Sequence, residues 1–182
     1  VFSIKKLMKS KENIVFLGMM GSGKSSIGSM VSKKLDLKFF DIDKLIEEKL
    51  GMQISHVFEL KGEKYFRQIE EEITLKTLKK NKVIISLGGG SFLNKNIRND
   101  ILNNHLSFWL NWSTNVILGR IMNNFKRPIA VKSTKEELID LIKKRSNIYS
   151  KALYKVNCNN LTKTEIVNKV LKIYYESEKI NC

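Results

Sequence analysis

The sequence predicts an α/β protein in which helices cover both faces of a parallel sheet. Short apolar runs alternate along the chain with amphipathic stretches, the pattern of parallel strands that are buried on both faces. A glycine-rich segment joins the first apolar run to the first amphipathic stretch. The chain has 182 residues and no internal repeat, so we expect a single domain over residues 13–182, preceded by an extension at 1–12.

The first apolar run, Ile14–Leu17, stops at Gly18 and is typical of a buried strand. Further strands are expected at 38–41, 83–87, 106–112 and 154–158. Apolar residues with a helical period predict helices over 25–35, from 44 onward, over 64–80, over 136–153 and over the stretch that carries 166–175.

One segment, 122–134, interrupts this alternation. It is polar and basic, contains the only proline of the chain, Pro128, and is longer than the usual connection between two helices. Long ordered loops often carry function, so we expect a mobile lid here.

The composition is biased toward positive charge, because 33 Lys and Arg oppose 18 Asp and Glu and give a formal net charge of +15. This surplus predicts an anionic partner, which could be nucleic acid, a membrane surface or a phosphorylated small molecule; the alternative is a general abundance of lysine. A nucleic-acid-binding face would gather the cations beside exposed aromatics, whereas the lysines are spread over most of the expected helices. No apolar run reaches the length of a membrane span. We therefore expect neither nucleic acid nor a membrane as partner.

The cysteines and the N-terminus bear on the compartment. Cys158 and Cys182 are too few for a disulfide framework and lack the spacing of metal ligands, which favours a reducing compartment. The basic N-terminal residues lack the long apolar core and the cleavage site of a secretory signal. We expect a cytoplasmic protein, or a plastid one if the N-terminus is the remnant of a longer leader.

Residues 18–25 read Gly-Met-Met-Gly-Ser-Gly-Lys-Ser and match the phosphate-binding pattern G-x-x-x-x-G-K-[ST] between a strand and a helix. Glycines let backbone N–H groups turn toward phosphate oxygens, and the helix N-terminus adds a partial positive charge. Lys24 is expected to reach the β- and γ-phosphates, and the Ser25 hydroxyl to bind Mg²⁺. The motif predicts that ATP or GTP is bound by Gly21, Ser22, Gly23, Lys24, Ser25 and Ser26.

Carboxylates and glycines follow the next two strands, at the end where sheets of this class bind ligands. Asp41 and Asp43 are spaced so that, on an extended segment, both carboxylates project to the same side. One could help to hold Mg²⁺ while the other accepts a proton from a substrate hydroxyl; the alternative is that Asp43 caps the following helix. The triplet Gly88–Gly90 permits close approach of a ligand to the backbone, or forms a sharp turn.

Two arginines are candidates for binding an anionic substrate. Arg145 falls in a gap of the apolar stripe of its helix, so its guanidinium should point inward and needs an anion there. Arg67 lies beside the stripe that contains Phe66, and its alternative role is a surface salt bridge with one of the acids within helical reach, which are Glu63, Glu70 and Glu71.

Together these motifs resemble those of the shikimate kinases over about residues 13–172. The shared motifs are the loop at 18–25, Phe-Asp-Ile-Asp at 40–43, Phe58, Gly62–Glu70, Ser86–Gly90, Arg127–Pro128 and Arg145–Tyr149. The resemblance implies a three-layer P-loop kinase fold with a five-stranded parallel sheet, a shikimate-binding region near 44–80 and the lid at 122–134. It further implies that a monomer transfers the γ-phosphoryl group of ATP to the 3-hydroxyl of shikimate, in the chorismate pathway to aromatic amino acids.

The resemblance also implies roles on the acceptor side. Asp43 matches the residue that binds the shikimate hydroxyls and is the candidate base. Arg67 and Arg145 match the two arginines that clamp the shikimate carboxylate. The remaining matches on this side are the glycines beside the ring hydroxyls and the aromatic walls of the pocket: Gly88, Gly89, Gly90, Phe58 and Phe66.

On the nucleotide side, the resemblance places Asp41 near Mg²⁺, Arg127 of the lid at the transferring phosphate and Arg120 against adenine. Two positions depart from the family pattern. Ala130 stands where a larger aliphatic residue is usual, and Asn-Cys-Asn-Asn at 157–160 replaces an Asp and a Pro that borders adenine. The alternatives are a gluconate or nucleoside monophosphate kinase, which share the phosphate loop, and a basic P-loop ATPase that binds nucleic acid.

Overall fold

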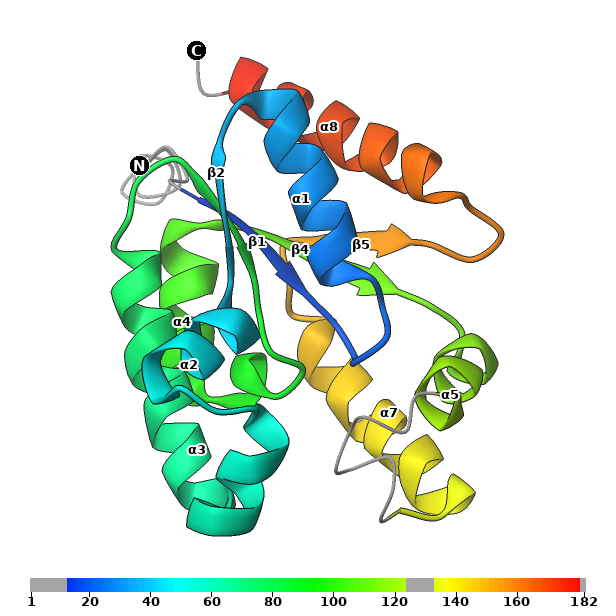
Figure 1. Cartoon of the computed structure of the whole chain (residues 1–182). Helices are drawn as coiled ribbons and strands as arrows, with labels where there is room; N and C mark the ends of the chain where they lie inside the picture. The colour runs from blue at the N-terminus through cyan, green and yellow to red at the C-terminus, as the bar shows by residue number, and fades with distance from the viewer. Residues whose placement is uncertain (1–12, 124–132, 181–182) are drawn as a thin grey trace, which may run out of the picture.

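The computed structural model describes residues 13–123 and 133–180 (Figure 1). Five strands form one sheet in the order β2-β3-β1-β4-β5, and every neighbouring pair is parallel. The strands are β1 (Ile14–Leu17), β2 (Lys38–Asp41), β3 (Val83–Ser86), β4 (Leu106–Asn111) and β5 (Tyr154–Asn157). The predicted five-stranded parallel sheet is confirmed; β1 and β2 have the expected bounds, and the other three strands end one residue early.

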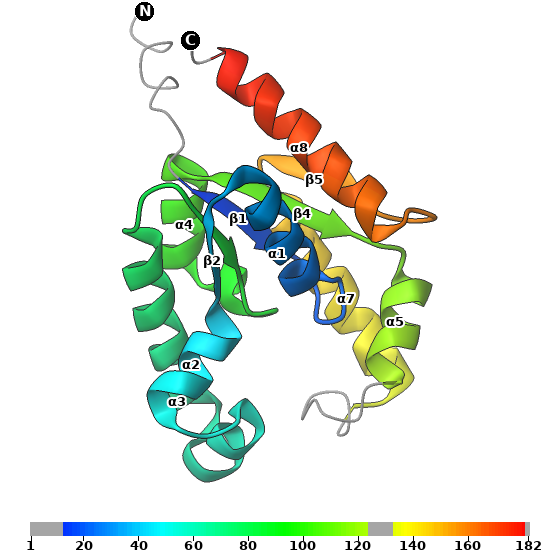
Figure 2. The same ribbon diagram turned by 45° about the horizontal axis from the view of Figure 1, so that its top comes forward.

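Helices cover both faces of the sheet, as expected, so the fold has three layers (Figure 2). The helices are α1 (Lys24–Leu35), α2 (Ile42–Leu50), α3 (Ile54–Leu78), α4 (Lys95–Asn104), α5 (Thr114–Met122), α7 (Lys135–Tyr149) and α8 (Lys163–Ile180), with a 3₁₀ turn, η2, at Ser91–Leu93. The apolar side chains of α1 and α8 form a cluster on one face of the sheet. Those of α2, α3, α4, α5 and α7 form the cluster on the other face. Among the described residues, no helix has both the length and the apolar composition needed to cross a membrane.

Strand β1 shows why the buried strands read as continuous apolar runs. Ile14 and Phe16 belong to the cluster with α1 and α8, whereas Val15 and Leu17 belong to the opposite cluster. Successive side chains of a strand point to opposite faces, and both faces are covered here. All four residues are therefore buried, and no polar alternation is left in the sequence.

The pairing register aligns the carboxyl ends of three strands. Phe16 of β1 is the partner of Ser86 of β3, and Ser86 is the partner of Asp41 of β2. The loop after β1, the start of α2 and the turn after β3 therefore begin side by side. In Figure 1, α2 and α3 project on one side of the loop after β1, and α5 and α7 project on the other.

Helix α3 is bent at Gly62, whose φ of 77° and ψ of 171° are not helical. The bend explains why the apolar period predicted only the second part of this helix, from residue 64, because a change of direction resets the period. It also brings Phe58 of the first part against Phe66 of the second, with ring centroids 4.6 Å apart.

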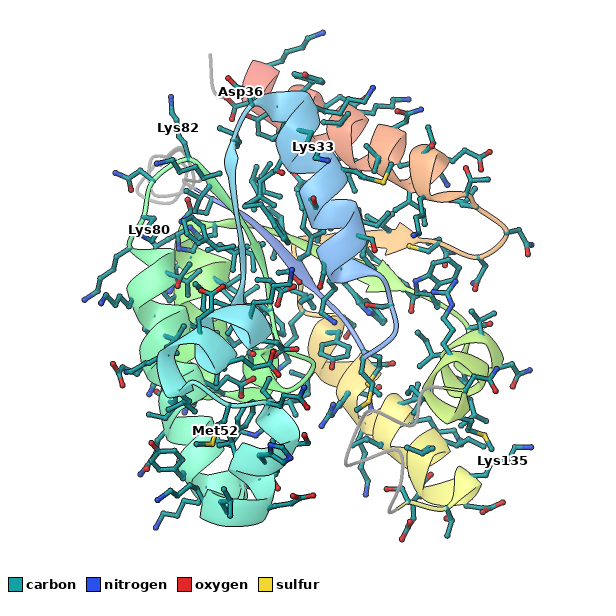
Figure 3. The ribbon with its side chains drawn as sticks, in the orientation of Figure 1. Lys33, Asp36, Met52, Lys80, Lys82 and Lys135 are labelled. Atoms are coloured by element: carbon teal, nitrogen blue, oxygen red, sulfur yellow. The ribbon has the colours of Figure 1, made fainter. Side chains whose placement is uncertain are left out.

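All but one of the lysines in residues 13–123 and 133–180 lie at the surface. Lys33 of α1, Lys80 after α3 and Lys135 of α7 are exposed and point outward from three separate elements (Figure 3). Lys24 is the exception, because it is buried at the start of α1.

Asn13 joins two elements through its side chain. It is 1% exposed. Its Nδ2 donates to the carbonyl oxygens of Leu78 (2.9 Å) and Lys80 (2.7 Å), and its Oδ1 accepts from the N–H of Val83 (3.1 Å). The amide thus holds the end of α3 to the start of β3, a role that the sequence did not indicate.

We expect Asn13→Ala to lower the free energy of unfolding by about 2–4 kcal/mol, since it leaves three backbone groups without their partner. Urea denaturation followed by circular dichroism measures this. The same substitution at the exposed Asn115 of α5 is the control, with an expected change within about 0.5 kcal/mol. Equal midpoints for the two variants would contradict the role of Asn13.

Candidate active site

The loop between β1 and α1 has the conformation that its glycines permit. Gly18, Gly21 and Gly23 have φ angles of 138°, 78° and 90°, which L-residues with a side chain rarely adopt. A Cβ at Gly18 would also lie 3.0 Å from the carbonyl oxygen of Leu110. Helix α1 begins directly after Gly23, so the N–H groups of its first turn face the loop without partners within the helix.

Two buried polar side chains of this loop suit a phosphate. Nζ of Lys24 donates to the carbonyl oxygens of Gly18 and Met19, both at 3.0 Å, so the ammonium lies folded against the loop. The Ser22 hydroxyl is buried and has no hydrogen-bond partner in the described structure. An orphaned buried hydroxyl is costly, and a phosphate oxygen would satisfy it.

Three oxygen-bearing side chains meet beside the loop, at the carboxyl ends of β2 and β3. Oγ of Ser25 lies 3.5 Å from Oγ of Ser86, which is the register partner of Asp41. Residues 13–123 and 133–180 contain no cluster of three or more His, Cys, Asp or Glu that could bind a metal by themselves. A few hard oxygen ligands suit Mg²⁺, which retains waters and binds phosphate oxygens.

The structure corrects the expected geometry of Asp41 and Asp43. Helix α2 begins at Ile42, so Asp41 is the N-cap and its carboxylate accepts from the N–H of Lys44 (3.4 Å). The two carboxylates do not share an extended segment, and Asp43 is not the cap. Instead, the first turn of α2 directs Asp43 to the turn after β3, where a Cβ at Gly88 would lie 2.8 Å from its Oδ1. A short sequence spacing cannot show where a strand gives way to a helix.

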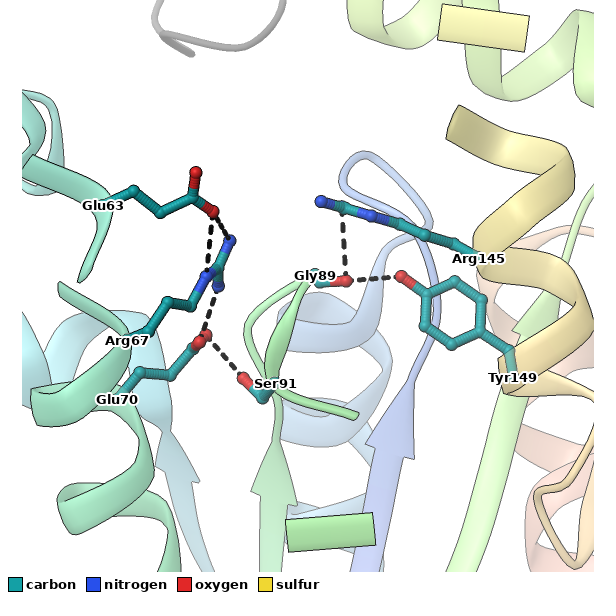
Figure 4. Close-up of polar contacts among 7 residues, drawn as sticks. All are labelled: Glu63, Arg67, Glu70, Gly89, Ser91, Arg145 and Tyr149. Atoms are coloured by element: carbon teal, nitrogen blue, oxygen red, sulfur yellow. Dashed lines mark hydrogen bonds and ion pairs between the residues drawn. The ribbon is translucent and has the colours of Figure 1, made fainter. Parts of the chain in front are cut away.

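Arg67 lies at the same turn, held by two acids of its own helix (Figure 4). Its Nη1 donates to Oε2 of Glu70 (2.6 Å), and its Nε and Nη2 donate to Oε1 of Glu63 (3.2 and 3.1 Å). Oε1 of the buried Glu70 accepts from the Ser91 hydroxyl (2.7 Å). Burial works against the charge of Arg67, but the two glutamates outweigh it and raise the pKa of the guanidinium. The expected i,i+4 salt bridge exists, but the buried link to Glu70 also fixes the guanidinium over the turn.

Gly88 and Gly90, in the turn after β3, leave space for the side chains of Glu70 and Arg67. A Cβ at Gly90 would lie 2.8 Å from Cζ of Arg67, and a Cβ at Gly88 would lie 2.6 Å from Oε1 of Glu70. Any side chain at either position would displace a charged group. Close approach, rather than the turn alone, therefore explains the glycines.

Arg145 of α7 reaches the turn from the other side. The residue is 6% exposed, which confirms that it points inward. Its Nη1 donates to the carbonyl oxygen of Gly89 over a long 3.4 Å, and its Nε has no partner. Within the described residues no carboxylate forms an ion pair with it. Figure 4 shows Arg145 reaching from α7 over Gly89 toward the side on which Arg67 lies, while the guanidinium of Arg67 is turned to Glu63 and Glu70.

The aromatic pair Phe58 and Phe66 lies next to Arg67. Phe66 is buried, and Cζ of Arg67 lies 5.1 Å from the centroid of its ring. Phe66 thus backs the guanidinium as well as the apolar core.

Arg120 lies on the opposite side of the phosphate loop. Its Nη1 donates to the carbonyl oxygen of Gly21 (3.1 Å), and its Cζ lies 3.8 Å from the ring centroid of Trp112. Nε1 of Trp112 in turn donates to the carbonyl oxygen of Ser22 (2.9 Å). The role of Trp112 could not be predicted from the sequence, because an aromatic residue at the end of a buried strand most often belongs to the core.

The departure at 157–160 has a structural role. Nδ2 of Asn111 donates to Oδ1 of Asn157 (3.1 Å), and the N–H of Ser113 donates to Oδ1 of Asn159 (2.9 Å). Asn157 therefore links the ends of β4 and β5, and Asn159 links the loop after β5 to the N-cap of α5. Arg98, which had no expected role, donates to the carbonyl oxygens of Phe92 and Leu93 and holds η2 in place.

Most of the expected lid lies outside the described residues. These exclude 124–132, and with them Arg127 and Ala130. The expectations for the two positions stay predictions.

Comparison with known proteins agrees with the geometry. The family model described as shikimate kinase matches residues 20–174. A shikimate kinase of Sulfurihydrogenibium sp. (strain YO3AOP1) is 40% identical over 160 residues, 88% of this chain and 96% of the relative. The structure of shikimate kinase from Acinetobacter baumannii in complex with shikimate superposes with a TM-score of 0.85 at 26% identity, over 94% of this chain and 97% of that one. A gluconokinase from Sinorhizobium meliloti 1021 reaches a TM-score of 0.57 at 16% identity, over 93% and 95%, and shares the fold alone.

Proposed function

The chain belongs to the shikimate kinase family, whose ATP-dependent members phosphorylate a hydroxyl of shikimate, and we propose how its residues divide this reaction. The proposal depends on one observation: Arg67 and Arg145 reach the same glycine turn from α3 and α7, Arg67 at Gly90 and Arg145 at Gly89, and this turn packs against the phosphate loop. Arg145 is buried, and the part of the chain that the structure describes supplies it with no acidic partner. A carboxylate between the two guanidinium groups supplies the missing anion.

The nucleotide half consists of the loop at 18–25, with Ser26 and Arg120. On binding ATP, Lys24 exchanges the carbonyl oxygens of Gly18 and Met19 for phosphate oxygens, and the Ser22 hydroxyl gains its partner. One face of the Arg120 guanidinium lies on Trp112, and the adenine ring stacks on the other face.

Ser25 and Asp41 are the residues that would hold Mg²⁺, with Ser86 beside them. Their oxygens fit this ion and leave most of its coordination to phosphate and water. When bound, Mg²⁺ neutralises charge on the β- and γ-phosphates.

The acceptor half orients shikimate from both ends. Arg67 and Arg145 bind the carboxylate in the fork geometry that suits a planar anion, and Phe58 and Phe66 form an apolar wall. The glycine turn brings the ring hydroxyls close to Asp43.

Asp43 accepts the proton of the 3-hydroxyl as its oxygen bonds to the γ-phosphorus and the bond to the β,γ-bridging oxygen breaks, which releases ADP. Arg127 of the lid is proposed to neutralise charge on the transferring phosphoryl group. The spread of the exposed lysines supports a protein without a nucleic-acid partner.

A parallel phosphotransfer assay tests this function. Shikimate, gluconate and a nucleoside monophosphate are each offered with ATP, with Mg²⁺ or with excess chelator, and ADP release is measured. We expect turnover with shikimate alone and its loss on chelation. A preparation that carries Lys24→Met controls for contaminating kinases. Equal turnover of gluconate or of a nucleoside monophosphate would contradict the proposal.

A further inference from the structure

Tyr149 is a buried polar residue of the site to which the reaction described above gives no role. It is the last residue of α7, one helical turn after Arg145, and is 1% exposed. Its hydroxyl donates to the carbonyl oxygen of Gly89 and lies 3.7 Å from Sδ of Met19 in the phosphate loop. Its ring packs against Trp109, with the centroids 6.2 Å apart. The phenol therefore contacts both the glycine turn and the phosphate loop.

The Gly89 carbonyl is shared between Tyr149 and Arg145. The phenol donates a hydrogen bond to it, whereas Nη1 of Arg145 lies 3.4 Å away, and within the described residues Nε of Arg145 has no partner (Figure 4). The tyrosine is thus the main donor to this oxygen. Because it satisfies the carbonyl, the guanidinium is left with little to bind inside the protein.

We propose that Tyr149 is a positioning residue, which keeps Arg145 available to the substrate by occupying the Gly89 carbonyl. The inference rests on the proposed function, in which Arg145 binds the carboxylate of shikimate. Without the phenol, Arg145 is the side-chain donor that remains to the Gly89 carbonyl within residues 13–123 and 133–180. The guanidinium would then turn toward Gly89, and shikimate would have to displace it.

The donor is present at every working pH. Burial raises the pKa of Tyr149 to about 12, although the nearby Arg145 works in the opposite direction. The phenol therefore stays protonated, and the effect should not depend on pH between about 6 and 9.

Tyr149→Phe tests the proposal, because it removes the hydroxyl and keeps the ring against Trp109. We expect the KM for shikimate to rise about 5- to 10-fold, which is the loss of roughly one hydrogen bond, while the KM for ATP changes less than 2-fold. Thermal unfolding is measured first to show that the variant is folded. Tyr154→Phe is the matched control, since Tyr154 packs on Phe108 of β4 in the other apolar cluster, and both KM values should be unchanged.

A double-mutant cycle shows whether Tyr149 acts through Arg145. In an Arg145→Lys background, Tyr149→Phe should change the KM for shikimate less than 2-fold, because the group that it positions is gone. The proposal would be overturned if the effects of Tyr149→Phe and Arg145→Lys on the KM for shikimate were additive. It would also be overturned if Tyr149→Phe raised the KM for shikimate and the KM for ATP equally. Neither result would affect the proposed function, provided that the wild type phosphorylates shikimate. A wild type without shikimate turnover would overturn the proposed function and, with it, this inference.

Discussion

Replacing Asp43 by Asn should lower kcat for shikimate phosphorylation by about 10²–10⁴-fold, the usual contribution of a general base. The amide keeps the shape of the side chain at Gly88 but cannot take up the proton of the attacking hydroxyl. The phosphate loop is untouched, so the dissociation constant of ADP should stay within 2-fold.

Steady-state kinetics and ADP titration calorimetry measure the two quantities. The same substitution at Asp140, which is exposed on α7 more than one helical turn before Arg145, serves as the control and should leave kcat unchanged. Wild-type turnover in Asp43→Asn would exclude this residue as the base.

Replacing Arg145 by Lys should raise the KM for shikimate by about 10- to 100-fold, because one charge-assisted hydrogen bond and the fork geometry are lost. A lysine retains the positive charge, so the change isolates geometry from charge. The KM for ATP should change less than 3-fold.

Arg120→Lys supplies the reciprocal control. Its guanidinium lies against Trp112 on the other side of the phosphate loop, so this variant should raise the KM for ATP and leave that for shikimate unchanged. If Arg145→Lys affected both substrates equally, the assignment of Arg145 to the carboxylate would fail.

The elements that the sequence predicted best are those with a strong local pattern. Strands β1 and β2 have the expected bounds, because apolar runs stop at a glycine or a carboxylate. The sequence predicts neither α4 nor α5. Both are short, with 10 and 9 residues, and each buries few apolar side chains: α4 buries only Ile97 and Ile101. In α3, the bend at Gly62 hid the first part of the helix.

Within the site, local pattern predicted inward-facing Arg145, because a single gap in an apolar stripe is visible in the sequence. The contacts among Asp43, Glu70 and Gly88 were not predictable, since they join α2, α3 and the turn after β3 through tertiary packing. The same holds for Trp112 and Tyr149. Their partners, Ser22 and Gly89, lie 90 and 60 residues away.

Asp41, Ser86 and Phe16 are paired in register across β2, β3 and β1 and form a row at the carboxyl ends of these strands. This row limits how a site of this kind can adapt to another substrate. Adjacent strands are about 4.8 Å apart, so the row fixes a span of about 10 Å from the strand before Asp43 to the strand before the phosphate loop. Backbone pairing sets this span, and no exchange of side chains alters it. Arg67 and Arg145, by contrast, stand on α3 and α7, whose positions depend on side-chain packing. A shift of α3 and α7 can therefore adapt the site to a longer or shorter acceptor, while the three strands keep the span from the strand before Asp43 to the strand before the phosphate loop constant.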